Sequence, residues 1–277
     1  MKLHTINTGF FKLDGGAMFG VVPKTIWQKL NPPDENNMCT WAMRCLLIED
    51  GNKLILIDNG IGKKQSEKFF SYYHLSGDDS LKKSLQNLGF APSNITDNFL
   101  SHLHFDHAGG GVEWNEDRSK YKTTFQNANY WTSKKHWENA LDSNPREKAS
   151  FLKENLLPME ESGQLKFVDD GHDMPFDLFY SDGHTTGMMV AMIPYKNTTV
   201  CFVADLFPSM HHIPINYNMG YDIRPLDIMD EKKRFLEMAA ANNWVLFFEH
   251  DPVNECCTVE LGERGYKVKE VFRLGDL

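Results

Sequence analysis

Residues 98–111 read NFLSHLHFDHAGGG, and this stretch gathers three histidines and one aspartate within six positions: His102, His104, Asp106 and His107. An apolar strand pattern precedes the cluster and three glycines follow it. Burying so many polar side chains without a metal would carry a heavy desolvation cost. Imidazole and carboxylate are ligands that a borderline metal such as zinc prefers. The stretch therefore predicts a metal site at the end of a strand.

The spacing inside this cluster predicts two metal positions. Residues two apart in an extended chain point to the same side, so His102 and His104 can bind one ion together. The turn that follows brings Asp106 and His107 round to a second position. The glycines after the cluster allow a sharp turn and a close approach of the backbone.

Apolar runs on both sides of the cluster indicate an α/β chain. CLLIED and LILIDNG flank a Gly-Asn turn and predict a hairpin over residues 45–60. DSLKKSLQNLGF predicts a helix with Leu81, Leu85 and Leu88 on one face and Gly89 as its C-cap. Later strands are expected in QLKFVDD, DLFYSDGH, MMVAMIPY and TTVCFVAD, a helix in EKKRFLEMAAANN, and a final buried strand in WVLFFEHD.

Strands that arrive in two batches, each followed by helices, predict two sheets between helices. The length of 277 residues fits one domain, 1–277. From about 123 to 160 the pattern is mainly helical and polar, and we expect a helical excursion that covers the site.

Composition restricts the partners. The net charge is −9 and no long basic run occurs, so a nucleic-acid partner is not expected. Five cysteines without a CxxC pair are typical of thiols in a reducing compartment. The chain has no signal-peptide pattern and no run of about 18 apolar residues, so we expect a cytoplasmic protein without a membrane span. A small-molecule substrate is expected, and a homodimer is compatible with the sequence.

HLHFDH resembles the HxHxDH signature of the metallo-β-lactamase superfamily. The resemblance continues in the same order through most of the chain, at Asp58 in LILIDNG, His184 in SDGHTTG, Asp205 in CFVAD and His250 in LFFEHD. It implies an α/β fold of the αββα sandwich type, with two mixed β-sheets flanked by helices.

The resemblance also implies a ligand set. One metal would take His102, His104 and His184, the other would take Asp106, His107 and His250, and Asp205 would bridge them. Two zinc ions are implied, with Fe, Mn or Co as alternatives. Asp106 would also act in catalysis by carrying a proton to the leaving group. Asp58 is expected to orient a ligand histidine or the HxHxDH turn, and the remaining histidines are expected to be non-ligands: His4, His74, His136, His172, His211 and His212.

Within the superfamily, HLHFDHAGG, GHTTG, EHDP and the segment GGAMFGVVPKTIW look most like acyl-homoserine lactonases and methyl parathion hydrolases. This resemblance implies a dinuclear metal-dependent hydrolase in which a metal-bridging hydroxide attacks the carbonyl of a lactone or ester. Many such lactonases carry a tyrosine three residues after the bridging aspartate, where this chain has Pro208. Either another group such as Tyr217 supplies that hydroxyl, or lactones are not the main substrate.

Three other functions stay open from the sequence. The first is an aryl phosphotriesterase of the methyl parathion hydrolase type. The second is a di-iron redox enzyme, which would absorb visible light where a zinc hydrolase does not. The third is a non-catalytic binding relative, which the intact ligand positions disfavour.

Overall fold

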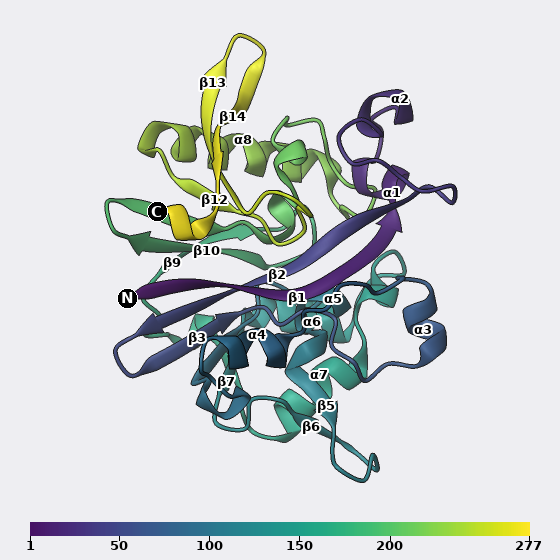
Figure 1. Ribbon diagram of the computed structural model, residues 1–277, viewed down its shortest axis with the longest axis vertical. Helices are drawn as coiled ribbons and strands as arrows, with labels where there is room; N and C mark the ends of the chain where they lie inside the picture. The colour runs from purple at the N-terminus through teal and green to yellow at the C-terminus, as the bar shows by residue number, and fades with distance from the viewer. The chain divides into compact units, whose positions relative to one another are not determined.

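The computed structural model describes residues 1–277 and contains two six-stranded mixed sheets (Figure 1). The first sheet has the order β1-β2-β3-β4-β7-β8, formed by Lys2–Asp14, Met38–Asp50, Lys53–Ile57, Asp97–Phe99, Asn129–Thr132 and Leu165–Phe167. The second has the order β14-β13-β12-β11-β10-β9; its strands β9 to β14 are Asp177–Ser181, Met188–Tyr195, Thr198–Phe202, Val245–Phe247, Cys256–Gly262 and Gly265–Phe272. A small hairpin pairs β5 (Val112–Trp114) with β6 (Tyr121–Thr123).

Eight α-helices connect these strands. In chain order, α1 to α8 are Gly15–Phe19, Lys24–Trp27, Glu67–Ser71, Leu81–Asn87, Phe105–Ala108, Lys134–Leu141, Lys153–Glu161 and Pro225–Asn242. Short 3₁₀ turns η1 to η7 are Pro92–Asn94, Gly109–Gly111, Lys148–Ser150, Val168–Asp170, Ala204–Leu206, Met210–His212 and Leu274–Asp276. The predicted fold class, with two mixed sheets and flanking helices, is confirmed.

The chain forms two compact units. The first comprises Met1–Gly9, Met43–Ser71 and Gly77–Met174, and the second comprises Phe10–Ala42, Tyr72–Ser76 and Pro175–Leu277. The boundaries between the two units fall inside β1 and β2. The single domain over 1–277 stays a prediction.

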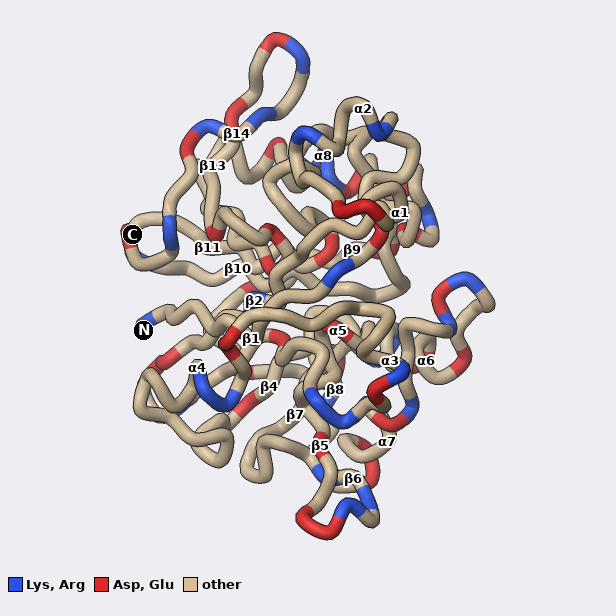
Figure 2. Tube along the Cα trace, turned by 45° about the vertical axis from the view of Figure 1, so that its right-hand side comes forward, with Lys and Arg blue, Asp and Glu red and all other residues tan.

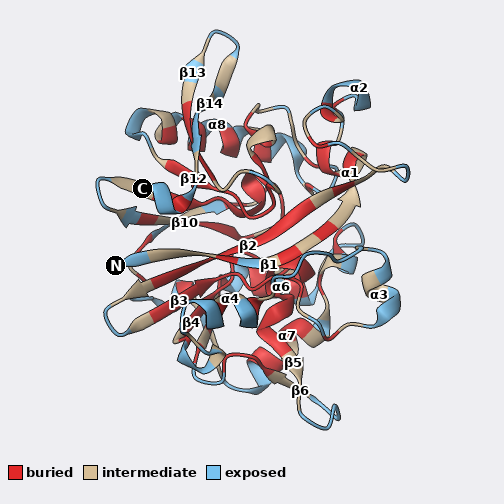
Figure 3. Cartoon of the chain, in the orientation of Figure 1, coloured by how far each residue is buried: buried red, intermediate tan, exposed pale blue.

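The core of the first unit explains why its sheet forms. Leu54 and Leu56 of β3 and Leu85 of α4 join one cluster of buried apolar side chains. Burying each such side chain contributes about 1.5–3 kcal/mol. Ser80 caps α4 by accepting a hydrogen bond from the backbone N–H of Lys83. Figure 3 shows which parts of the chain are buried: β2 is buried along most of its length, and α3 is largely exposed.

Several sequence predictions for single elements are confirmed and others are wrong. The hairpin of β2 and β3 and the helix α4 are present, but Leu88, which follows the last residue of α4, is 38% exposed. WVLFFEHD does contain β12, yet it is not the last strand, because β13 and β14 follow it. β14 is mostly solvent-facing and mixes charged with apolar residues, so it has no apolar run from which a strand could be predicted.

The stretch predicted as a helical excursion contains the helices α6 and α7, but it begins with a strand. β7 lies between β4 and β8 and pairs parallel with both. Its sequence, NYWT, is too short to give a clear pattern, and the pairing across the sheet decides its conformation. The small hairpin of β5 and β6 was also not expected.

Parallel strand pairs place the polar segments of each unit. In the first unit, β3 runs parallel to β4, so the chain that follows both strands emerges at the same edge. In the second unit, β11 runs parallel to β12 with the same result. Asp58, just after β3, has φ 55°, and Ala204, just after β11, has φ 44°. Such left-handed geometry in residues other than glycine is costly and is commonly found at functional sites.

Charges are spread along the chain. Figure 2 shows Lys and Arg interspersed with Asp and Glu rather than gathered in one basic stretch. None of the helices combines the length and the apolar character that a membrane crossing requires.

The glycines after HLHFDH allow the backbone of residues 59–61 to approach closely, and they are not needed for a left-handed turn. A Cβ at Gly109 would collide with the carbonyl oxygen of Ile61, and one at Gly110 with that of Asn59. Gly109 itself has φ −70°, a value open to any residue. The segment after β3 therefore lies directly against the glycine turn.

We expect Gly110→Ala to lower the free energy of unfolding by about 1–3 kcal/mol, because the added methyl group overlaps backbone that cannot move aside freely. Urea denaturation of the full chain measures this. Gly275→Ala is the control, since a Cβ there meets nothing within 4 Å. Equal stability of both variants and the unmodified chain would contradict the packing argument.

Candidate metal centre

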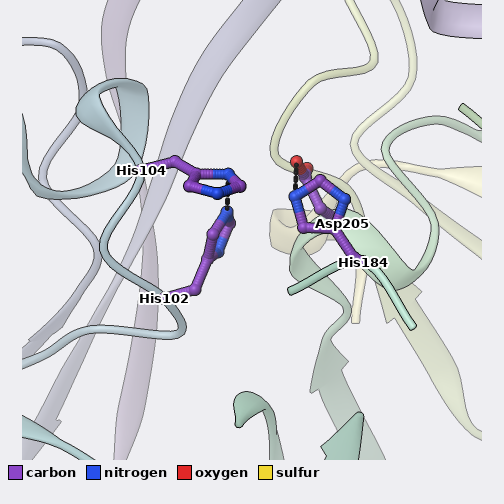
Figure 4. Close-up of side chains that lie close together, drawn as sticks. All are labelled: His102, His104, His184 and Asp205. Carbon is purple, nitrogen blue, oxygen red and sulfur yellow. Dashed lines mark hydrogen bonds and ion pairs between the residues drawn. The ribbon is translucent and has the colours of Figure 1, made fainter. Parts of the chain in front are cut away.

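The first unit brings together the four residues of the HxHxDH segment. They do not lie in the strand, because β4 ends at Phe99, and α5 begins at Phe105. Nε2 of His102 lies 3.1 Å from Nδ1 of His104 (Figure 4). His102 is fully buried and His104 is 7% exposed. The two imidazoles therefore lie side by side, in a segment that follows the strand rather than continuing it, and their joint binding of one ion stays a prediction.

The Asp58 carboxylate contacts this segment at Ser101 and His107. Its Oδ1 accepts a hydrogen bond from the backbone N–H of Ser101 at 2.7 Å, and its Oδ2 accepts one from the Ser101 hydroxyl at 2.5 Å. Oδ2 also lies 3.0 Å from Nδ1 of His107. Ser101 Oγ in turn lies 3.1 Å from Nδ1 of His102. The expected orienting role of Asp58 thus extends to two of the histidines.

The second unit places Asp205 between two histidines. Its Oδ2 lies 3.1 Å from Nε2 of His184, and its Oδ1 lies 3.2 Å from Nε2 of His250. Figure 4 shows the contact with His184. Asp205 stands in η5 directly after β11, and His250 follows β12. The two oxygens of one carboxylate therefore contact two different imidazoles.

The outward nitrogens of these two rings are also bound. Nδ1 of His184 lies 2.9 Å from Oδ1 of Asp222, and Nδ1 of His250 lies 2.7 Å from the carbonyl oxygen of Ala42. Burial lowers the pKa of His184, but Asp205 and Asp222 raise it more, to about 10. Without a metal ion the surroundings of His184 thus favour a protonated ring, and a bound cation would take the place of the proton on Nε2. Asp222 is a functional contact that the sequence analysis missed, because no motif surrounds it.

The donor set fits divalent metal ions. In four of the rings one nitrogen is held by a carboxylate, a hydroxyl or a carbonyl, which fixes the tautomer and leaves the other nitrogen as a lone-pair donor. Two ligands of a tetrahedral ion with bonds of about 2.0–2.1 Å are about 3.3 Å apart. The measured separations of 3.1–3.2 Å for the pairs His102–His104, His184–Asp205 and His250–Asp205 are close to that value. Asp106, in the first turn of α5, is 8% exposed, and its Oδ2 lies 3.9 Å from Nε2 of His107.

A narrow recess in the second unit adjoins Asp205. It has no room for a water molecule, and Pro208 and Tyr217 both line it. Lys232 of α8 fixes the backbone here by donating hydrogen bonds to the carbonyl oxygens of Pro214 and Tyr217, each at 3.0 Å. Burial lowers the pKa of this lysine to about 7. The structure thus brings Tyr217 to the same recess as Asp205.

His212 and His136 are not among the metal-facing groups. His212 Nε2 donates to the carbonyl oxygen of Met18 at 2.9 Å and its Nδ1 accepts from Ser209 Oγ at 2.8 Å. Burial lowers its pKa to about 3, so the ring is neutral. His136 Nε2 accepts the backbone N–H of Leu103 at 2.8 Å. Both rings use their nitrogens to hold other segments.

Comparison with known proteins agrees with this geometry. The family model described as the metallo-β-lactamase superfamily matches residues 44–250, which include all seven predicted ligand positions. Among curated proteins, the chain is similar to the N-acyl homoserine lactonase AiiA of Bacillus thuringiensis subsp. kurstaki. The two are 24% identical over 264 residues, which cover 90% of this chain and 93% of that protein.

Solved structures agree with the family match. A "probable metal-dependent hydrolase" from Staphylococcus aureus has a TM-score of 0.88 and 26% identity, covering 100% of this chain and 98% of that one. AidC, a dizinc quorum-quenching lactonase solved with the product N-hexanoyl-L-homoserine, has a TM-score of 0.76 and 25% identity, covering 98% and 94%. Fold, donor set and family model together place the chain: it belongs to the metallo-β-lactamase superfamily and is a metal-binding hydrolase.

Proposed function

We propose that the chain is a dinuclear metal-dependent hydrolase that opens a lactone or cleaves a related ester. In this proposal His102, His104 and His184 would hold one ion, Asp106, His107 and His250 would hold the other, and Asp205 would be shared by both. The ions would be zinc, with Fe, Mn or Co as alternatives.

The observation that carries the dinuclear proposal is the position of Asp205. Its two carboxylate oxygens address the Nε2 atoms of two different histidines, His184 and His250, at 3.1 and 3.2 Å. The outward nitrogens of both histidines are bound, so each presents its remaining lone pair beside Asp205.

Two bound ions would supply a nucleophile from water at neutral pH and polarise the carbonyl oxygen of the substrate. The residues of the chain have the remaining tasks. In the hydrolysis of a lactone, the oxygen of water bonds to the carbonyl carbon and the ring C–O bond breaks. Asp106 accepts the proton of the attacking water and delivers it to the departing alkoxide oxygen, which leaves a hydroxy acid.

We propose a lactone as the substrate because the similar proteins include lactonases. AiiA is named an N-acyl homoserine lactonase, and AidC is described with a homoserine product bound. Tyr217 lines the recess beside Asp205, and we propose that its hydroxyl replaces the one that Pro208 cannot supply. We assign it the task of donating a hydrogen bond to the developing oxyanion.

Pro208 also favours a second candidate, an aryl phosphotriesterase. A phosphoryl oxygen can be polarised by metal ions without help from an oriented hydroxyl. Such a substrate would therefore depend less on Tyr217 than a lactone does.

Elemental analysis tests the metal content. We expect about two transition-metal ions per chain, mostly zinc, because seven ligands with one shared member suit two ions. A value that stays near zero after zinc is supplied during expression would refute the proposed centre.

Asp205→Ala tests the bridge. Because the proposed bridge shares the Asp205 carboxylate between both ions, its loss should remove both metal content and activity. Asp230→Ala, an exposed carboxylate in α8, is the matched control and should keep both. Full turnover with normal metal content in Asp205→Ala would show the bridging role to be wrong.

Tyr217→Phe tests the substrate class. We expect hydrolysis of acyl-homoserine lactones or simple γ-lactones, with a slower side activity on aryl phosphotriesters. Removing one oriented donor should lower lactone turnover by about 10²–10³ and phosphotriester turnover much less. Tyr72→Phe, at an exposed tyrosine, is the control.

Two results would change this assignment. Equal losses on both substrates would remove Tyr217 from the mechanism. A metal-loaded chain that cleaves phosphotriesters but no lactone would transfer the proposal to the phosphotriesterase.

A further inference from the structure

His104 differs from the other histidines of the site in the nitrogen that it turns toward its neighbours. It presents Nδ1 to Nε2 of His102, so its own Nε2 points to the opposite side. On that side lies Glu147, whose Oε2 is 3.9 Å from Nε2 of His104. The two side chains are 9% and 3% exposed, so this contact lies away from bulk water.

Glu147 is fixed by its own neighbours rather than by His104. Its Oε1 accepts hydrogen bonds from Nδ2 of Asn139 at 3.1 Å and from Nδ2 of Asn144 at 2.8 Å. Oδ1 of Asn144 accepts the backbone N–H of Arg146 at 2.9 Å, which holds the turn before η3 in shape. Both amides bind one oxygen, and the second oxygen is the one directed at His104. The carboxylate is therefore placed before any metal binds.

The same segment also holds the backbone between the two histidines. His136, on α6 with Asn139, accepts the N–H of Leu103 at 2.8 Å. Phe151 lies against both His104 and His136, with ring centroids 4.9 and 5.7 Å apart. Residues 134–151 thus contact this segment at three points: the backbone N–H of Leu103, the ring of His104 and Nε2 of His104.

We propose that Glu147 is a positioning residue for His104, fixing the tautomer in which Nε2 carries the proton and Nδ1 presents its lone pair to a metal ion. The inference rests on the proposed metal centre. A carboxylate near the remote nitrogen of an imidazole ligand makes that ligand more basic and fixes its orientation. Asp58 holds this position for His107 and Asp222 holds it for His184. The separation of 3.9 Å is too long for a direct hydrogen bond, so the contact acts through charge or one bridging water.

The proposal separates metal affinity from the stability of the metal-free chain. A buried carboxylate costs free energy in the absence of a cation, so Glu147→Gln should leave the metal-free chain as stable as before or more stable. The bound ion offsets that cost, so the same substitution should weaken zinc binding. Loss of an outer partner of a metal ligand typically lowers metal affinity by about 10- to 100-fold.

The experiment compares the full-length unmodified chain, Glu147→Gln and Glu138→Gln after removal of metal with a chelator. Glu138 lies on α6 and is exposed, so its variant is the matched control. Zinc affinity is measured by competition with a chromophoric chelator, and thermal unfolding is followed with and without zinc. Cobalt-loaded protein gives a further readout, since its visible spectrum reports the geometry around the ligands.

We expect Glu147→Gln to bind zinc about 10- to 100-fold more weakly and to show an altered cobalt spectrum, with unchanged unfolding of the metal-free chain. Zinc affinity equal to that of the unmodified chain would overturn the role of Glu147 and leave the metal centre standing. A loss of stability in the metal-free variant would make Glu147 a structural residue and also overturn the proposal. An unmodified chain that binds no zinc would overturn the centre itself.

Discussion

Asp58 accepts hydrogen bonds from the backbone and hydroxyl of Ser101 and from Nδ1 of His107, and the geometry of the HxHxDH segment depends on these contacts. A buried carboxylate with several donors is held firmly, because each lost partner would leave a desolvated charge. Through Ser101 the constraint reaches Nδ1 of His102. The glycine turn packs against the chain after Asp58, which fixes the other end of the segment.

The second unit repeats this logic with different residues. Asp222 binds the outward nitrogen of His184, and a backbone carbonyl, that of Ala42, binds the outward nitrogen of His250. Asp205 stands after a residue with positive φ, as Asp58 itself has positive φ. In both units a residue with positive φ follows a parallel strand pair, and a carboxylate at that point contacts imidazole rings.

Elements with a strong local pattern were predictable, and those that depend on partners were not. The hairpin of β2 and β3 and the helix α8 have long apolar runs or a helical period, and both are present. β7 and β14 have neither: β7 is four residues long, and β14 is paired on one side only at the edge of its sheet. Such strands form because a neighbour supplies their hydrogen bonds, which a single segment cannot reveal.

The sequence by itself determined the donor types, their order along the chain and the superfamily, because imidazoles and carboxylates at fixed spacing leave few other uses. Only the tertiary structure decided which nitrogen of each ring is held and by what. Asp222 lies 38 residues from His184, and Glu147 lies 43 residues from His104. A ring nitrogen is fixed by whatever packs against it, and such contacts are set by folding rather than by neighbours in the chain.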